Sequence, residues 1–364
     1  MKKFIMQMQP LFGKEESDAL TEYMSEGAFL TEFKKTEIFE SMIREFTGAK
    51  HCIVTNSGTI SLTVAALALD LKPGDEVLVP NYTMIATPNS LKLVGIRPIF
   101  VDVEPETLCI DFEKVQSLIT KKTKAIVLVS ANGRYPKTDI IEFKKLAFEK
   151  NLFLIEDAAQ SLGSYYPDGR HIGTVGNIGC FSFSTPKIIS TGQGGAIVTN
   201  NETIAQKIRR LKDFGRSSGG NDHHSTIGYN FKFTDLQAVI GIEQMKKLPG
   251  RLVRKKKIWQ LFKEKLSRVD QIKFFNHDLD YTTPWFIDSI VENRSALITY
   301  LKEEGIGTRP MYPPINEQAA YKDPGIHPVS QFVGINGLWF PSMIQITDDE
   351  IDYIVEKIEY FYRQ

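Results

Sequence analysis

The chain has few cysteines, no net charge and no long apolar run, and each of these absences excludes a class of protein. Cys52, Cys109 and Cys180 are too few, and odd in number, for a disulfide framework, and their apolar neighbours favour buried, reduced thiols. Lys plus Arg equals Asp plus Glu at 44 each, so the electrostatic footprint of a nucleic-acid binder is missing. No apolar run of about 18 residues occurs, and the N-terminus lacks a signal-peptide core. We therefore expect a cytoplasmic protein without nucleic-acid or membrane partners.

Three local features are compatible with a special site, but a simpler interpretation is favoured for each. The basic run Arg251 to Lys257 is interpreted as the solvated face of a helix rather than an anion site. His223 and His224 have no third ligand at suitable spacing, so we expect a flexible active-site loop at 217–225 and no metal. Trp285 and Trp339 are expected in the core or at a domain interface rather than as base-stacking platforms.

The first 200 residues alternate short apolar runs with amphipathic stretches such as Ser61–Leu69 and Asp139–Glu149. Strands separated by helices of this length predict crossover connections and a mainly parallel sheet covered by helices. The predicted strands are Cys52–Thr55, Glu76–Val79, Pro98–Val103, Ala125–Ser130, Leu152–Glu156 and Ala196–Thr199. Several of them end in polar or Gly-rich turns, which is where ligands bind in open α/β sheets.

The pattern changes after about Thr234. Asp235–Lys247, capped by Thr234, and Val253–Leu266 are predicted as two long helices. A strand at Trp285–Val291, a helix at Ser295–Glu304 stopped by Gly305, and a final helix at Asp348–Tyr362 complete a smaller α+β unit. We therefore expect a large domain at residues 1–245 and a small C-terminal domain at residues 246–364.

One segment places a lysine after an apolar strand and a turn rich in hydroxyl groups. It runs from Cys180 through Phe181, Ser182 and Phe183 to Lys187, and glycines follow at Gly192, Gly194 and Gly195. A lysine amine becomes nucleophilic only when its pKa falls, through desolvation or a nearby positive charge, and an apolar strand end provides desolvation. A surface lysine in a loop explains the segment equally well when it is taken alone.

An acid closes the preceding buried strand, about thirty residues before Lys187, at Glu156-Asp157. An unpaired buried acid is costly, and a protonated pyridine nitrogen would be a suitable partner that makes the ring an electron sink. Asp157 is also suited to cap a helix.

The turn Asn56-Ser57-Gly58-Thr59, just before a helix, offers a glycine for close backbone approach and free amides at a helix N-terminus. This is a phosphate site by geometry and dipole, although a plain strand-helix turn is equally compatible. Phosphate turn, acid and lysine together fit one ligand, an aldehyde-bearing pyridine with a phosphate arm.

These motifs, in this order and over nearly the full length, resemble the DegT/DnrJ/EryC1/StrS family of sugar aminotransferases that use pyridoxal phosphate (PLP). The matching segments are Ser57-Gly58-Thr59, Gly74-Asp75-Glu76-Val77, Glu156-Asp157-Ala158-Ala159-Gln160, Ser182 to Lys187, Gly192 to Gly195, and Gly228-Tyr229-Asn230. The resemblance implies the aspartate-aminotransferase fold (fold type I), an α/β architecture with a mainly parallel seven-stranded sheet in the large domain.

The resemblance also implies roles for individual residues. Lys187 would form the internal Schiff base and then shuttle protons, Asp157 would pair with the pyridine nitrogen, and Gln160 would approach the phenolic oxygen of the ring. Gly58, Thr59 and Ser182 match phosphate contacts. Asn230 matches a residue that reaches the phosphate of the neighbouring subunit, which implies an obligate homodimer with shared active sites. Lys232 and Arg309 match positions near the substrate.

The chain departs from the family pattern at several of these places. Met84 stands where an aromatic ring commonly covers the cofactor face, and a thioether packs there less flatly. Gln193 replaces an acid in the glycine segment. Ser130 replaces a histidine that usually leads the turn Ser130 to Pro136, and Tyr312-Pro313-Pro314 also lacks a histidine. Substrate contacts at these turns cannot be carried over from the family.

We therefore expect a transaminase that takes an amino group from an amino acid, by resemblance L-glutamate. The acceptor would be a nucleotide-linked 4-keto-6-deoxy sugar, with a GDP-perosamine-like product favoured. Two alternatives remain. A PLP-dependent sugar dehydratase would carry histidine in place of Lys187. A PLP-binding sensor or scaffold would have no need of the complete Asp157–Lys187 pair.

Overall fold

The computed structural model describes residues 4–27, 29–217 and 222–363, and two sheets organise it. The large sheet has seven strands in the order β1-β7-β6-β5-β4-β2-β3. Its strands are β1 (His51–Thr55), β2 (Glu76–Pro80), β3 (Arg97–Val101), β4 (Thr123–Val129), β5 (Phe153–Asp157), β6 (Ile178–Ser182) and β7 (Gly195–Thr199). β6, β5, β4, β2 and β3 pair in parallel, whereas β7 is antiparallel to both of its neighbours. The predicted mainly parallel sheet is confirmed.

Helices cover both faces of the large sheet. On one face, α2 (Lys34–Thr47), α5 (Phe112–Leu118), α6 (Ile140–Glu149) and the first half of α8 (Asp235–Lys265) pack in one apolar cluster. On the other face lie α3 (Gly58–Ala68), α4 (Ala86–Lys92) and α7 (Glu202–Lys212). Alternate residues of β4 divide between the two clusters, Ile126 in the first and Val127 in the second. A strand buried on both faces is apolar at every position for this reason.

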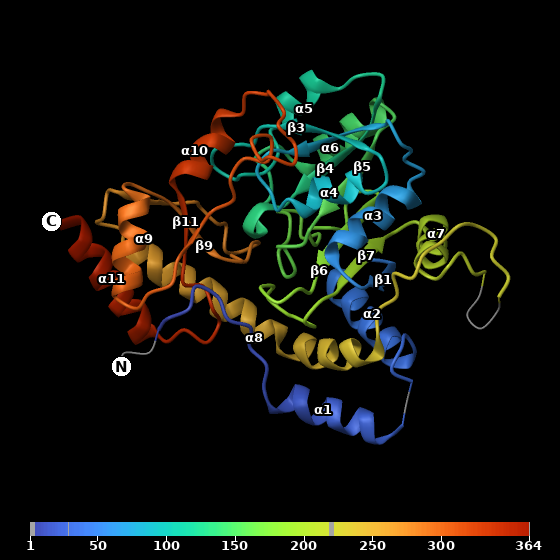
Figure 1. The fold of residues 1–364 in the computed structure, drawn as a ribbon, viewed down its shortest axis with the longest axis horizontal. Coiled ribbons are helices and arrows are strands. Elements are labelled where there is room, and N and C mark those ends of the chain that lie inside the picture. Colours follow the sequence, from blue (N-terminus) through green and yellow to red (C-terminus); the bar gives the residue numbers. More distant parts are fainter. Residues whose placement is uncertain (1–3, 28, 218–221, 364) are drawn as a thin grey trace.

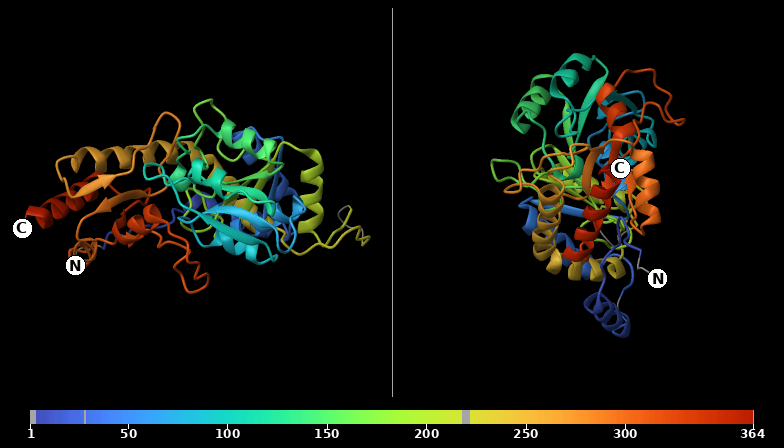
Figure 2. Two further views of the ribbon diagram at one scale, coloured as in Figure 1. Left: turned by 90° about the horizontal axis from the view of Figure 1, so that it is seen from above. Right: turned by 90° about the vertical axis from the view of Figure 1, so that its left-hand side faces the viewer.

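A smaller antiparallel sheet has the order β10-β11-β9-β8. Its strands are β8 (Ile272–Phe274), β9 (Ile287–Val291), β10 (Arg309–Pro310) and β11 (Gly337–Phe340). It packs with the second half of α8, with α9 (Arg294–Glu303) and with α11 (Asp348–Arg363). α1 (Lys14–Ser25) lies along α8 away from the sheets, and α10 (Pro328–Asn336) lies near β11 (Figure 1). The two lobes lie side by side and are joined along α8 (Figure 2).

The prediction of two helices between Asp235 and Leu266 was wrong, because α8 is continuous over 31 residues and contains Pro249. Thr234 caps it as expected, its side chain accepting a hydrogen bond from the Gln237 amide. A proline lacks the N–H of one helical hydrogen bond, and tertiary packing on both sides compensates here. Leu248 belongs to the large-sheet core and Ile258 to the small-sheet core. The predicted domain division at residue 245 falls inside this helix and stays a prediction.

The basic run Arg251 to Lys257 is not a solvated face, which corrects a second expectation. Arg251 and Lys255 are 5% and 4% exposed. Arg251 donates to the Leu11 carbonyl at 2.8 Å, and Lys255 donates to the Trp285 carbonyl at 2.6 Å. Arg251 and Lys255 lie one turn apart on the inner face of α8. Because other segments cover this face, the two side chains contact those segments instead of solvent. Backbone carbonyls accept hydrogen bonds from both side chains there, which offsets part of the cost of burying the charges.

We expect Phe39→Ala to lower the free energy of unfolding by about 3 to 5 kcal/mol. Phe39 on α2 is fully buried, and its ring packs against Phe183 and Phe233, with centroid distances of 5.2 and 5.8 Å. Phe148→Ala is the control, since that ring is 87% exposed and its loss should change stability by less than about 0.5 kcal/mol. Urea unfolding of both variants measures the difference, and equal midpoints would contradict this assignment of the core.

Candidate active site

Lys187 lies in the turn that follows β6, and its side chain is half-buried, with the amine directed into the protein. Burial lowers the pKa of its amine to about 8, while the negative charge of Asp157 acts in the opposite direction. The Nζ atom lies 4.2 Å from the centroid of the Trp285 ring. Within the part of the chain that the structure describes, no carboxylate forms a salt bridge with this amine. A lysine held in this way is nucleophilic close to neutral pH.

Asp157 ends β5 and is also buried. Its Oδ2 accepts a hydrogen bond from Thr87 Oγ1 at 2.7 Å, and its Oδ1 accepts one from the Ala159 amide at 3.2 Å. Burial raises the pKa of this carboxyl, and Thr87, Ala159 and the charge of Lys187 partly oppose the rise. A carboxylate oriented in this way and short of a full counter-charge suits a cationic ligand group.

Glu156, the neighbour of Asp157, points to the other face of the sheet, as consecutive strand residues must. Its carboxylate accepts hydrogen bonds from the amides of Gly173, Val175 and Gly176 and from the Tyr166 hydroxyl. It therefore holds the loop before β6. Of the two adjacent acids in the motif, one is structural and one faces the site.

Gln160 lines a pocket together with Ser182, Lys187 and Trp285. Its Oε1 accepts a hydrogen bond from the Asn132 amide at 2.6 Å. The carbonyl end of the side chain is engaged in this way, so the NH2 group is the end that can donate to a ligand.

The start of α3 forms a cradle beside the end of β6. Ser57 caps the helix, with its Oγ accepting a hydrogen bond from the Ile60 amide at 3.2 Å. A Cβ added to Gly58 would lie 2.7 Å from the Ser182 Cβ, so only glycine permits this approach. Gly58, Thr59 and Ser182 are thus brought together at the N-terminus of an 11-residue helix, as a phosphate site requires.

The other four predicted residues lie at the periphery. Met84, in the turn after β2, is 44% exposed. Asn230 is exposed and forms a β-bridge with Asp213. Lys232 donates to Asp213 Oδ1 at 2.9 Å, and its Nζ lies 4.1 Å from the centroid of the Phe214 ring.

Arg309, on β10 of the small sheet, is exposed, with its guanidinium carbon 5.5 Å from the centroid of the Trp339 ring. The segment that carries Asn230 is tied to the phosphate turn, because the Phe231 carbonyl accepts the Asn56 amide at 3.1 Å.

Two functional candidates were missed by sequence reasoning. Thr87 holds Asp157 from 70 residues away, and no local pattern marks it. Trp285 was assigned to the core or an interface, and it does belong to a buried apolar cluster with Trp339. Its second contact, with Lys187, joins two segments that no spacing in the sequence relates.

Within the described ranges 4–27, 29–217 and 222–363, two kinds of feature are absent. No group of three or more His, Cys, Asp or Glu residues suited to a metal ion occurs there. Part of the loop that holds His223 and His224, residues 218–221, lies outside those ranges. In that part of the chain, no helix combines the length and apolarity that crossing a membrane would need. The three cysteines are free and buried, as expected.

The comparisons with known proteins agree with this geometry. The DegT/DnrJ/EryC1/StrS aminotransferase family model matches residues 10–359. The chain belongs to this family. It is 32% identical to the GDP-perosamine synthase of Escherichia coli O157:H7, over 99% of both chains. It is 29% identical to that of Vibrio cholerae, over 97% of this chain and 98% of the relative.

Solved structures give the same result. An aminotransferase from Psychrobacter cryohalolentis superposes with a TM-score of 0.91 at 28% identity, covering 98% of each chain. A DegT DnrJ EryC1 StrS aminotransferase from Brucella abortus gives 0.90 at 28% identity, covering 96% of each. The protein is a PLP-dependent sugar aminotransferase with the fold that its sequence predicted. The glycine cradle, the buried acid and the buried amine fit the phosphate, the ring nitrogen and the aldehyde of that cofactor.

We expect Lys187→Met to stabilise the cofactor-free protein at pH 7 by about 1 to 3 kcal/mol. The folded-state pKa of about 8 lies below the ordinary 10.5, so burial of the ammonium destabilises the wild type most below pH 8. As pH rises from 8 to 10.5, the folded protein already holds a neutral amine, so the advantage of methionine should shrink.

Urea unfolding at several pH values measures the difference in free energy of unfolding between Lys187→Met and the wild type. Lys144→Met, at an exposed position, is the control and should show no such pH dependence. A gap for Lys187→Met that stays constant between pH 7 and pH 10.5 would contradict the lowered pKa.

Proposed function

We propose that this enzyme moves the amino group of L-glutamate to a nucleotide-linked 4-keto-6-deoxy sugar, giving a GDP-perosamine-like product in amino-sugar biosynthesis. The observation that carries the reaction type is the buried Asp157–Lys187 pair beside the Gly58 cradle. The choice of sugar is supported by the GDP-perosamine synthases of Escherichia coli, Vibrio cholerae and Caulobacter vibrioides, which are 29% to 32% identical over at least 90% of each chain.

When bound, PLP supplies an electron sink and a carrier for the amino group. Asp157 would keep the pyridine nitrogen protonated, and Thr87 and the Ala159 amide fix the orientation of its carboxylate. Gly58, Thr59 and Ser182 would hold the phosphate, and the Gln160 NH2 group would donate to the phenolic oxygen. Met84, in the turn after β2, is the residue that would face the ring by its match to the family position.

Lys187 would hold the cofactor, and its amine is the group that can act as base and acid in the proton transfer. A pKa of about 8 lets its Nζ accept a proton from the substrate carbon and return it without a large free-energy cost in either direction. We assign Lys232 and Arg309 to the anionic substrate because their positions match substrate positions of the family. Lys232 pairs with Asp213, and Arg309 lies over the Trp339 ring.

We further propose a homodimer with shared sites, in which Asn230 of one protomer reaches the cofactor phosphate of its partner. The exposure of Asn230 on a segment bonded to the phosphate turn supports this arrangement. A cytoplasmic location stays a prediction.

A half-reaction and a substrate panel test the proposed reaction. The purified PLP-loaded enzyme mixed with L-glutamate should lose its visible cofactor band as the amine form accumulates. Added GDP-, dTDP- and UDP-linked 4-keto-6-deoxy sugars should then restore the band, the GDP sugar fastest. Lys187→Ala should lose nearly all turnover, about a thousandfold or more. A band that glutamate does not bleach would contradict transamination, and ammonia release without an acceptor would indicate a dehydratase.

Mixed dimers test the shared site. Lys187→Ala and Asn230→Ala homodimers should each be nearly inactive, but co-expressed chains should recover about a quarter of wild-type activity. In a mixed dimer, one site receives both defects and the other receives none. If each site were built from a single chain, both sites of the mixed dimer would be defective, and no recovery would be seen.

A further inference from the structure

The indole of Trp285 forms one wall around the Lys187 amine. Trp285 is 4% exposed, and Lys187 Nζ lies 4.2 Å from its ring centroid. The indole is itself fixed among other rings, 3.9 Å from Phe286 and 6.2 Å from Trp339 between centroids. The amine therefore meets a rigid aromatic surface whose negative face attracts a cation.

Hydrogen bonds also fix the backbone on both sides of Lys187. Trp285 Nε1 donates to the Pro186 carbonyl at 2.6 Å. Arg251 Nη1 donates to the Ile188 carbonyl at 2.9 Å. The carbonyls of both neighbours of the lysine are thus held by side chains from distant parts of the sequence.

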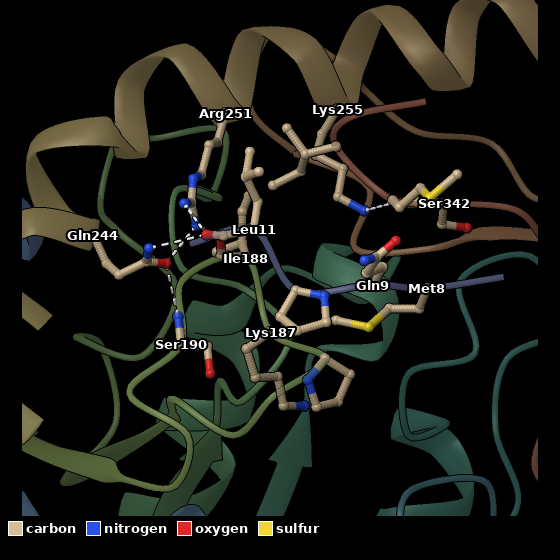
Figure 3. Close-up of a pocket in the computed structure, with 14 residues that line it drawn as sticks. Met8, Gln9, Leu11, Lys187, Ile188, Ser190, Gln244, Arg251, Lys255 and Ser342 are labelled. Carbon is tan, nitrogen blue, oxygen red and sulfur yellow. Dashed lines mark hydrogen bonds between the residues drawn. The ribbon is translucent and has the colours of Figure 1, made fainter. Parts of the chain in front are cut away.

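Lys255 holds Trp285 in turn. Its Nζ donates to the Trp285 carbonyl at 2.6 Å and to the Ser342 carbonyl, and the side chain is buried. Lys255 and Arg251 both extend from α8 to the pocket that Lys187 lines, as Figure 3 shows. A buried ammonium satisfied by two carbonyls is a costly arrangement that needs a reason beyond packing.

We propose that Trp285 is a positioning residue for Lys187 in transamination, and that Lys255 keeps Trp285 in place. The inference rests on the proposed function, in which Lys187 is the cofactor lysine. Lys187 must carry a positive charge for part of each cycle. A carboxylate in direct contact would hold the proton on the lysine too tightly. An indole face stabilises the ammonium only modestly, so the lysine can still give up its proton.

The charged groups around Lys187 are few in the described structure. Asp157 approaches from β5, and Arg251 and Lys255 approach from α8. The indole lies between the small-domain strand β9 and the lysine turn, so it also couples the position of the amine to that of the small domain.

The test measures how fast the full-length protein, freed of cofactor, captures added PLP as a function of pH. Capture requires a neutral lysine amine and is followed by the visible band, so its pH dependence reports the pKa of Lys187 independently of turnover. Trp285→Leu removes the aromatic face. In this variant, the acid limb of the plot of PLP capture rate against pH should shift to lower pH by roughly half a unit to one and a half units, because the Lys187 ammonium loses stabilisation.

Trp285→Phe is the matched variant, since it keeps an aromatic face but lacks the N–H that binds Pro186. The acid limb of its capture rate should stay at the wild-type pH. In turnover, its kcat should fall while KM for glutamate changes little. A purely structural role would lower the melting temperature of both variants and leave both pH limbs at the wild-type position, which would overturn the proposal.

Lys255 is tested by Lys255→Met, with Lys257→Met, at an exposed position on the same helix, as the control. Lys255→Met should slow capture at its optimal pH by roughly tenfold to a hundredfold, as misplacement of a reacting group does. Lys255→Arg should restore most of the rate, and Lys257→Met should match the wild type. Adding Trp285→Leu to Lys255→Met should cause little further loss, because the two act in series.

Failure of this inference is distinguishable from failure of the proposed function. If Lys187→Ala still forms the lysine-bound band with PLP, Lys187 is not the cofactor lysine, and both proposals fall. If Lys187→Ala abolishes the band but Trp285→Leu and Lys255→Met follow the wild-type curve, the inference alone is wrong.

Discussion

The Asp157 carboxylate is buried, the Lys187 ammonium is largely withdrawn from solvent, and neither charge is fully compensated. Desolvation moves both pKa values toward the neutral forms, the lysine downward and the aspartic acid upward, and each group partly opposes the shift of the other. This constraint organises the site. A direct ion pair would relieve the burial cost, but it would also fix the proton on the lysine. The protein instead holds Asp157 with Thr87 and an amide, and faces Lys187 with an indole.

Keeping these groups apart requires a rigid framework, and α8 provides much of it. Its first half packs on the large sheet and its second half on the small sheet, so one helix fixes both lobes to a common axis. Arg251 and Lys255 lie between those halves and bind backbone carbonyls from four other segments, at Leu11, Ile188, Trp285 and Ser342. Arg251 and Lys255, which the sequence suggested as part of a solvated surface, therefore connect segments in the interior.

The sequence predicted the parts of this site that depend on local order along the chain. Apolar strands followed by polar turns located Lys187, Asp157 and the Gly58 turn, because ligands gather at the carboxyl ends of parallel strands. Periodicity could not foresee Thr87 or Trp285, whose roles come from contacts across 70 and about 100 residues. The continuity of α8 was also out of reach. Pro249 is a helix-breaking signal, and only packing against two sheets explains why the helix continues.

The turn 130–136 begins with Ser130 where the family usually carries a histidine, and this turn has a structural role in the protein. Its residues are buried rather than open to substrate, with Asn132 and Arg134 at 4% and 3% exposed. The Asn132 side chain exchanges two hydrogen bonds with the Phe286 backbone, and Arg134 forms a buried ion pair with Asp288 at 2.7 Å.

Leaving either charge of the Arg134–Asp288 pair unpartnered would be strongly destabilising, so the turn and β9 move together or not at all. The Asn132 amide also binds Gln160, and the residue before Phe286 is Trp285. The turn thus links Gln160, which lines the pocket beside Lys187, to the indole that faces the lysine. A turn held in this way by the Arg134–Asp288 pair and by Asn132 is not free to change its shape independently of β9.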